Sequence, residues 1–113
     1  MRNQAYERFT SSRQEPVRLG IALDEFFSPE LDAAIRECYA TYLQKRLGPA
    51  ITELVLREDL TALEALRSMG WLDAHRVDDA IVQARRQKRT AALIWLLQIK
   101  QSDFGYHDKS FPL

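Results

Sequence analysis

Residues 50–70 read AITELVLREDLTALEALRSMG, and residues 80–100 read AIVQARRQKRTAALIWLLQIK. The two stretches match when one is shifted over the other by 30 residues, and identical residues then fall at Ala50 and Ala80, Ile51 and Ile81, Ala62 and Ala92, Leu63 and Leu93, and Leu66 and Leu96. Self-similarity at a period of roughly 20 to 50 residues is typical of stacked helical repeats. The sequence therefore predicts an all-α fold in which two helical hairpins form a stack.

Turn and capping signals set the boundaries of these hairpins. The four helices are expected at about residues 49–57, 60–69, 74–88 and 90–101. The charged pair Glu58 and Asp59 marks the first turn, and Gly70 ends the second helix. Asp73 is placed to cap the third helix, and Thr90 to cap the last one after a turn at Arg89.

A further helix is predicted over residues 28–48. Ser28 has the hydroxyl of an N-cap, Pro29 suits the first helical position, and Gly48 ends the helix before the next one opens. Apolar residues then recur at spacings of three and four, and Cys38 belongs to this stripe, so we expect it to be an inert core thiol. Since an array of two hairpins exposes an apolar face at each end, this helix is the expected cap of the first hairpin.

The remaining segments are the N-terminal residues 1–27 and an aromatic tail over residues 102–113. A short helix is expected within residues 3–13, followed by a short helix or turn that packs through Phe26 and Phe27. The tail has no helical period, yet it is too apolar for a freely solvated end, and it is the expected cover of the last hairpin. With 113 residues, the whole chain is expected to form a single domain, 1–113.

Composition narrows the classes of function. The chain has 16 basic and 16 acidic side chains and a formal net charge of zero, which argues against a dedicated nucleic-acid or membrane-surface binder. The single cysteine forms no intramolecular disulfide and fits a reducing compartment. The first 16 residues lack the apolar core of a signal peptide, and no apolar run is long enough to span a bilayer. We therefore expect a cytoplasmic protein without membrane association.

The hairpins resemble a degenerate ankyrin-repeat array. Ala84 stands where the family has a central alanine, Lys88 replaces the turn glycine, and Leu93, Leu96 and Leu97 match the leucine-rich second helix. In the earlier unit Glu58 replaces the glycine, while Leu63, Leu66 and Gly70 fit the pattern. Both units lack the Thr-Pro-Leu-His opening, and the shorter period implies that the projecting finger is shortened or lost. The ending FGYHDKSF resembles the last residues of uncharacterised bacterial proteins with similar hairpins.

Catalytic chemistry is not expected. No combination of base, nucleophile and oxyanion donor is apparent, and with four glycines the chain has little material for a phosphate loop. His75, His107 and Cys38 do not show metal-ligand spacing. We therefore expect neither an enzyme nor a cofactor or metal site.

The candidate partner-binding residues are Trp71, Arg85, Arg86, Lys88, Arg89, Phe104 and Tyr106. The four basic residues form the one basic cluster of the sequence, which suits either phosphate groups or favourable placement at a helix C-terminus. Trp71 follows Gly70 and is either a binding anchor or part of the packing of the connector. We expect a non-catalytic protein–protein interaction module; the alternative is a small nucleic-acid-binding or regulatory protein that uses residues 85–89.

Overall fold

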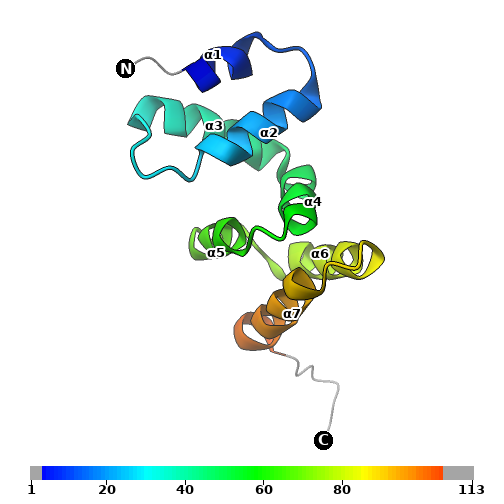
Figure 1. Ribbon diagram of the computed structural model, residues 1–113. Coiled ribbons are helices and arrows are strands. Elements are labelled where there is room, and N and C mark those ends of the chain that lie inside the picture. Colours follow the sequence, from blue (N-terminus) through cyan, green and yellow to red (C-terminus); the bar gives the residue numbers. More distant parts are fainter. Residues whose placement is uncertain (1–3, 106–113) are drawn as a thin grey trace, which may run out of the picture. The chain divides into compact units, whose positions relative to one another are not determined.

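The computed structural model describes residues 4–105. Within this range every regular element is a helix and no strand occurs, which confirms the all-α fold class (Figure 1). Along this part of the chain the elements are α1 (Gln4–Ser11), α2 (Glu15–Glu25), α3 (Ala33–Lys45), α4 (Leu47–Arg57), α5 (Leu60–Ser68), α6 (Ala74–Arg86), α7 (Thr90–Ile99) and the π-helical turn η1 (Lys100–Phe104). Internal contacts divide the chain into two compact units, 1–50 and 51–113.

The first unit has an aromatic core. Helix α1 packs against α2, and α2 packs against α3. The Phe9 ring of α1 lies edge-on to the rings of Tyr39 and Tyr42 in α3, with centroids 4.9 Å apart in both pairs. Each such pair contributes roughly 0.5–1.5 kcal/mol beyond the burial of its area. The buried apolar residues of this unit are Phe9, Ile21, Ala22, Leu23, Phe26, Tyr39, Tyr42, Leu43 and Ala50.

The start of α3 differs from the prediction. The helix begins at Ala33, and Asp32 is its N-cap, because the Asp32 carboxylate accepts hydrogen bonds from the backbone N–H groups of Ala34 at 3.0 Å and Ile35 at 3.3 Å. Ser28 instead accepts from the Glu30 N–H, which closes a local turn. Both Ser and Asp are good capping residues, and the carboxylate also gains from the positive end of the helix dipole.

A single side chain of α3 holds the segment that precedes it. The Arg36 guanidinium donates to the backbone carbonyls of Phe26, Ser28 and Leu31, at 3.2, 3.0 and 3.4 Å. The Ser28 carbonyl also accepts from the Leu31 N–H at 3.3 Å, and the guanidinium adds side-chain donors to a segment that lies between two helices. The segment 26–31 is therefore a turn rather than the first turn of a helix.

The expected core position of Cys38 is wrong. The buried face of α3 is formed by Tyr39, Tyr42 and Leu43, whereas Cys38 is exposed. Its sulfur accepts a hydrogen bond from the Tyr6 hydroxyl at 3.4 Å. The pattern of apolar residues was broad enough to fit two registers, and the large tyrosine rings bury more area than a thiol.

After α3 the four predicted helices are present, with ends that agree to within two residues. Helices α6 and α7 pack against each other as a hairpin. Three helices, α4, α5 and α6, end with the same hydrogen-bond pattern, a Schellman motif whose left-handed residue is Glu58 (φ 53°), Gly70 (φ 78°) and Lys88 (φ 58°), respectively. Only glycine adopts this conformation without strain, so the turns at Glu58 and Lys88 carry a local cost.

Burial also recurs at the offset of 30 residues. Four of the five identical pairs are buried at both positions, namely Ala50 and Ala80, Ile51 and Ile81, Ala62 and Ala92, and Leu66 and Leu96. The fifth pair differs, because Leu63 is fully buried while Leu93 is partly exposed. The two stretches therefore share most of their buried positions. They also share the left-handed turn between their two helices, at Glu58 and at Lys88, but they differ in the burial of Leu63 and Leu93.

The caps of α6 and α7 are unlike each other. Asp73 caps α6 as predicted, and its carboxylate accepts from the Arg76 N–H at 2.8 Å. The predicted cap at Thr90 is wrong, because Thr90 is already helical and Arg89 holds the N-cap position without a side-chain bond. The side-chain acceptor that caps α7 comes from the turn between α4 and α5. There Glu58 Oε2 accepts a hydrogen bond from the Ala92 N–H at 3.1 Å.

Ion pairs fix η1 to the helices of this unit. The Arg67 guanidinium of α5 forms a two-pronged bond to Asp103, with 2.7 Å from Nε to Oδ2 and 2.8 Å from Nη2 to Oδ1. Hydrogen bonding to Arg67 lowers the pKa of the Asp103 carboxyl. Lys100 pairs with Asp78 of α6 at 2.9 Å. The chain end of the described region is thus tied to both α5 and α6.

Candidate functional site

The structure places the predicted basic cluster at the end of α6 and in the turn that follows. Arg85, Arg86 and Lys88 are exposed, and within residues 4–105 no hydrogen bond or ion pair engages their side chains. Arg89 is different, because it is partly buried and its Nε has no hydrogen-bond partner. Three cations are therefore free to meet an anionic surface, while Arg89 is held in the turn.

The predicted aromatic candidates are placed less uniformly. Trp71 is partly exposed in the short connector between α5 and α6. Phe104 is 36% exposed at the end of η1. Tyr106 lies outside the described residues. The structure thus places Trp71 and Phe104 in the second unit, each with a part of its ring in solvent.

Helix α7 presents an apolar surface whose residues are not among the partner-binding candidates predicted from the sequence. Its sequence, TAALIWLLQI, contains no charged residue, and only Thr90 and Gln98 are polar. Ala92, Leu96 and Ile99 are buried. Ile94 lies opposite to them on the helical wheel and is 52% exposed. Leu93, Trp95 and Leu97 are partly exposed on either side.

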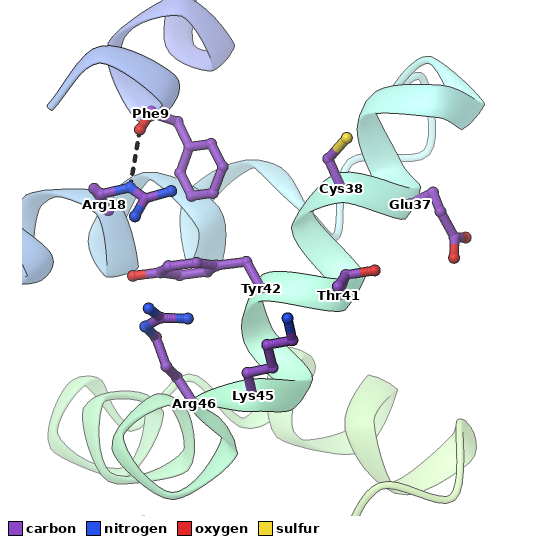
Figure 2. Close-up of a pocket in the computed structure, with 8 residues that line it drawn as sticks. All are labelled: Phe9, Arg18, Glu37, Cys38, Thr41, Tyr42, Lys45 and Arg46. Carbon is purple, nitrogen blue, oxygen red and sulfur yellow. Dashed lines mark hydrogen bonds between the residues drawn. The ribbon is translucent and has the colours of Figure 1, made fainter.

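The first unit contains a pocket of about 400 Å³ that the sequence did not predict. Its lining comes from three helices and one cap: Phe9 of α1, Arg18 of α2, Glu37, Cys38, Thr41, Tyr42 and Lys45 of α3, and Arg46, the C-cap of α3 (Figure 2). Positions 38, 41, 42, 45 and 46 recur at helical spacing, which is the signal in the sequence that marks one face.

Two guanidinium groups enclose the Tyr42 ring. Figure 2 shows Arg18 above the ring and Arg46 below it, and the guanidinium carbons lie 4.9 and 4.3 Å from the ring centroid. Arg18 also lies 4.7 Å from the centre of the Phe9 ring and donates from Nε to the Phe9 carbonyl at 3.1 Å. Such cation–π contacts contribute roughly 0.5–2 kcal/mol, more when the groups are shielded from water.

One carboxylate holds this stack together. Glu15 Oε1 accepts from the Tyr42 hydroxyl at 2.7 Å and from Arg46 Nε at 2.9 Å, and its other oxygen lies 3.5 Å from Arg18 Nη1. The hydrogen bond from Tyr42, followed by the two arginines, lowers the pKa of Glu15. Burial and the same hydrogen bond raise the pKa of Tyr42 to about 12. The phenol therefore stays protonated and the carboxylate ionised across the physiological range.

Lys45 differs from the two arginines. Within the described part of the chain its ammonium has neither a hydrogen bond nor an ion pair. Figure 2 shows it pointing from α3 toward the side of Tyr42 on which Arg46 lies, while Glu37 points away from these cations. The pocket therefore combines two fixed guanidinium groups with one uncompensated ammonium.

Among residues 4–105 no group of three or more His, Cys, Asp or Glu side chains is arranged to hold a metal ion. His75 pairs with Asp79 of the same helix at 3.3 Å, and both side chains are largely in solvent. No described helix combines the length and the apolar character of a bilayer-spanning segment. Comparisons with protein-family models, with curated proteins and with solved structures gave no match.

Proposed function

We propose that this chain is a non-catalytic protein-interaction module that binds its partner through the outward side of α7. A helix at a protein surface normally carries charged residues on its solvent face. Helix α7 has none, and the half-exposed Ile94 stands at the middle of its outward side. The uncharged outward side of α7, with Ile94 between the partly exposed Leu93, Trp95 and Leu97, is the observation that carries the proposal, because extended apolar surface marks interaction sites.

The proposed architecture is a short ankyrin-like pair of helical hairpins. The buried pairs at an offset of 30 residues and the matching turns at Glu58 and Lys88 support it. The connector between α5 and α6 has five residues, Met69 to Asp73, which is too short for the projecting finger of an ankyrin repeat. Binding through the helix faces is therefore proposed in place of binding through fingers.

A reducing compartment such as the cytoplasm is the proposed location. Cys38 is exposed and unpaired, and a free surface thiol persists where the environment keeps it reduced.

The test compares two substitutions of an exposed residue by lysine. Ile94→Lys places a charge on the proposed surface of α7, and Gln87→Lys places the same charge at the exposed C-cap of α6, outside that surface. We expect a partner cross-linked and captured by the intact chain to be lost with Ile94→Lys and retained with Gln87→Lys, while circular dichroism shows both variants folded. Equal capture by the two variants would reject α7 as the binding surface.

Nucleic-acid binding is the second candidate, because Arg85, Arg86 and Lys88 are exposed and uncompensated. Neutralising phosphates releases counterions, so the affinity would fall steeply with salt. Arg86→Glu should then weaken binding and reduce the salt slope by about one or two units. An unchanged affinity of Arg86→Glu for RNA or DNA would remove this candidate.

A further inference from the structure

The pocket of the first unit joins a preorganised cationic wall to an unpaired ammonium. Arg18 is fixed by the Phe9 carbonyl and by two aromatic rings, and Arg46 by Glu15 and the Tyr42 ring. Because these contacts already order both side chains, a ligand would not have to immobilise them. Each guanidinium has five N–H donors, and its contacts with Phe9 and Glu15 use only some of them.

The charges around the pocket do not cancel. Arg18, Lys45 and Arg46 line it as cations, and the carboxylates nearby are Glu37 in the lining and Glu15, which binds the Tyr42 hydroxyl. One positive charge is left over, and it is placed at Lys45, since Glu15 is taken up by the two arginines and Tyr42. The site therefore favours an anion near Lys45 and Arg46.

The two faces of the Tyr42 ring are not open to a ligand. The guanidinium groups of Arg18 and Arg46 occupy the two sides of Tyr42. A base or another planar group thus finds no free stacking platform on this ring. What remains available is a set of N–H donors and an ammonium, which match the oxygens of a tetrahedral oxyanion.

We propose that this pocket binds the phosphate group of a small phosphorylated molecule, with Lys45 and Arg46 as the residues that hold it. A volume of about 400 Å³ lies within the range of small-molecule sites, roughly 300–1,000 Å³, and suits a ligand of modest size. A dianionic phosphate gains more from two adjacent cations than a carboxylate does. The site is separate from the proposed protein-binding surface on α7, so either can fail without the other.

The experiment is a titration of the full chain with inorganic phosphate at constant ionic strength, monitored through the amide chemical shifts. Acetate and chloride are titrated in parallel. Phosphate should produce saturable shifts at the amides of Thr41, Lys45 and Arg46, and weaker or no saturable shifts are expected from the other two anions. Lys45→Gln should raise the phosphate Kd about tenfold, the effect of losing one charge-assisted contact. Lys45 has no partner among the described residues, so this change leaves the fold intact.

Lys88→Gln is the matched control, because Lys88 is an exposed lysine in the other basic cluster. It should leave the phosphate Kd unchanged. Saturable shifts centred on the amides of Arg85, Arg86 and Lys88, acetate binding as tight as phosphate binding, or a Lys45→Gln variant with the original Kd would each overturn the proposal.

Discussion

The carboxylate of Glu58 accepts a hydrogen bond from the backbone N–H of Ala92, 34 residues later in the chain, at 3.1 Å. Glu58 is the residue that takes the left-handed conformation at the end of α4, and Ala92 lies in the first turn of α7. The turn between α4 and α5 thus supplies the cap that α7 lacks in its own sequence. This hydrogen bond offsets part of the strain of Glu58, whose left-handed conformation would otherwise favour glycine.

Glycine substitutions at the two equivalent turns should therefore differ. Lys88→Gly relieves left-handed strain without losing a described contact, and we expect the free energy of unfolding to rise by about 0.5–1 kcal/mol. Glu58→Gly relieves the same strain but loses the cap on α7, which contributes about 1 kcal/mol, so little or no net gain is expected. Urea unfolding of both variants measures the difference. Equal stabilisation by the two changes would show that the bond to Ala92 contributes nothing.

Two tyrosines of the first unit should respond in opposite ways to the loss of their hydroxyl groups. The Tyr39 hydroxyl is buried without a hydrogen-bond partner, so Tyr39→Phe should stabilise the protein by about 1 kcal/mol. The Tyr42 hydroxyl donates to Glu15, and Tyr42→Phe should cost about 1.5–3 kcal/mol. Thermal and urea unfolding provide the comparison, and destabilisation by Tyr39→Phe would indicate an unseen partner for its hydroxyl.

Stability should fall at alkaline pH. Burial raises the pKa of Tyr39 to about 12, and burial with the hydrogen bond to Glu15 does the same for Tyr42. An unfolded tyrosine has a pKa of about 10, so the unfolded state loses these protons first as the pH rises. The contribution is complete below about pH 10 and is lost between about pH 10 and 12, with a slope of about 1.4 kcal/mol per pH unit for each group.

Urea unfolding at several pH values between 9 and 12 tests this slope. Tyr39→Phe should reduce the slope of the free energy of unfolding against pH by the contribution of one of the two tyrosines. A decline that is identical in the variant would mean that Tyr39 does not titrate differently in the folded and unfolded states.

Two leucines at equivalent positions should differ in their contribution to the core. Leu63 is fully buried, and Leu63→Ala should cost about 2–5 kcal/mol. Leu93 is partly exposed, so the cost of Leu93→Ala should be clearly smaller, about 1 kcal/mol. Both values come from denaturant unfolding. A similar cost at the two positions would show that Leu93 is more deeply packed than its exposure indicates.

The helices of the second unit were predictable because their ends carry local signals. Gly70 and Asp73 act within a few residues of their own position, and both behave as their residue type predicts. The cap of α7 was not predictable, since it comes from Glu58, a residue distant in sequence. The start of α3 was misplaced because Ser28 and Asp32 are both good caps, and Arg36 decides between them by binding the carbonyls in front of the helix.

The pocket could not be predicted for the same physical reason. Glu15 and Arg46 are 31 residues apart, and Phe9 and Arg18 reach Tyr42 only after three helices have packed. The spacing of Cys38, Tyr42 and Lys45 shows that they share one face of α3. It does not show that a second helix delivers another cation to that face.

The three carbonyl bonds of Arg36 have a consequence for the order of folding. The guanidinium can reach Phe26, Ser28 and Leu31 only when α3 is already helical, because the helix sets the position and direction of this side chain. The turn between α2 and α3 should therefore become ordered after α3, late on the folding pathway. Loss of these bonds, as in Arg36→Met, should then speed unfolding and leave the folding rate almost unchanged.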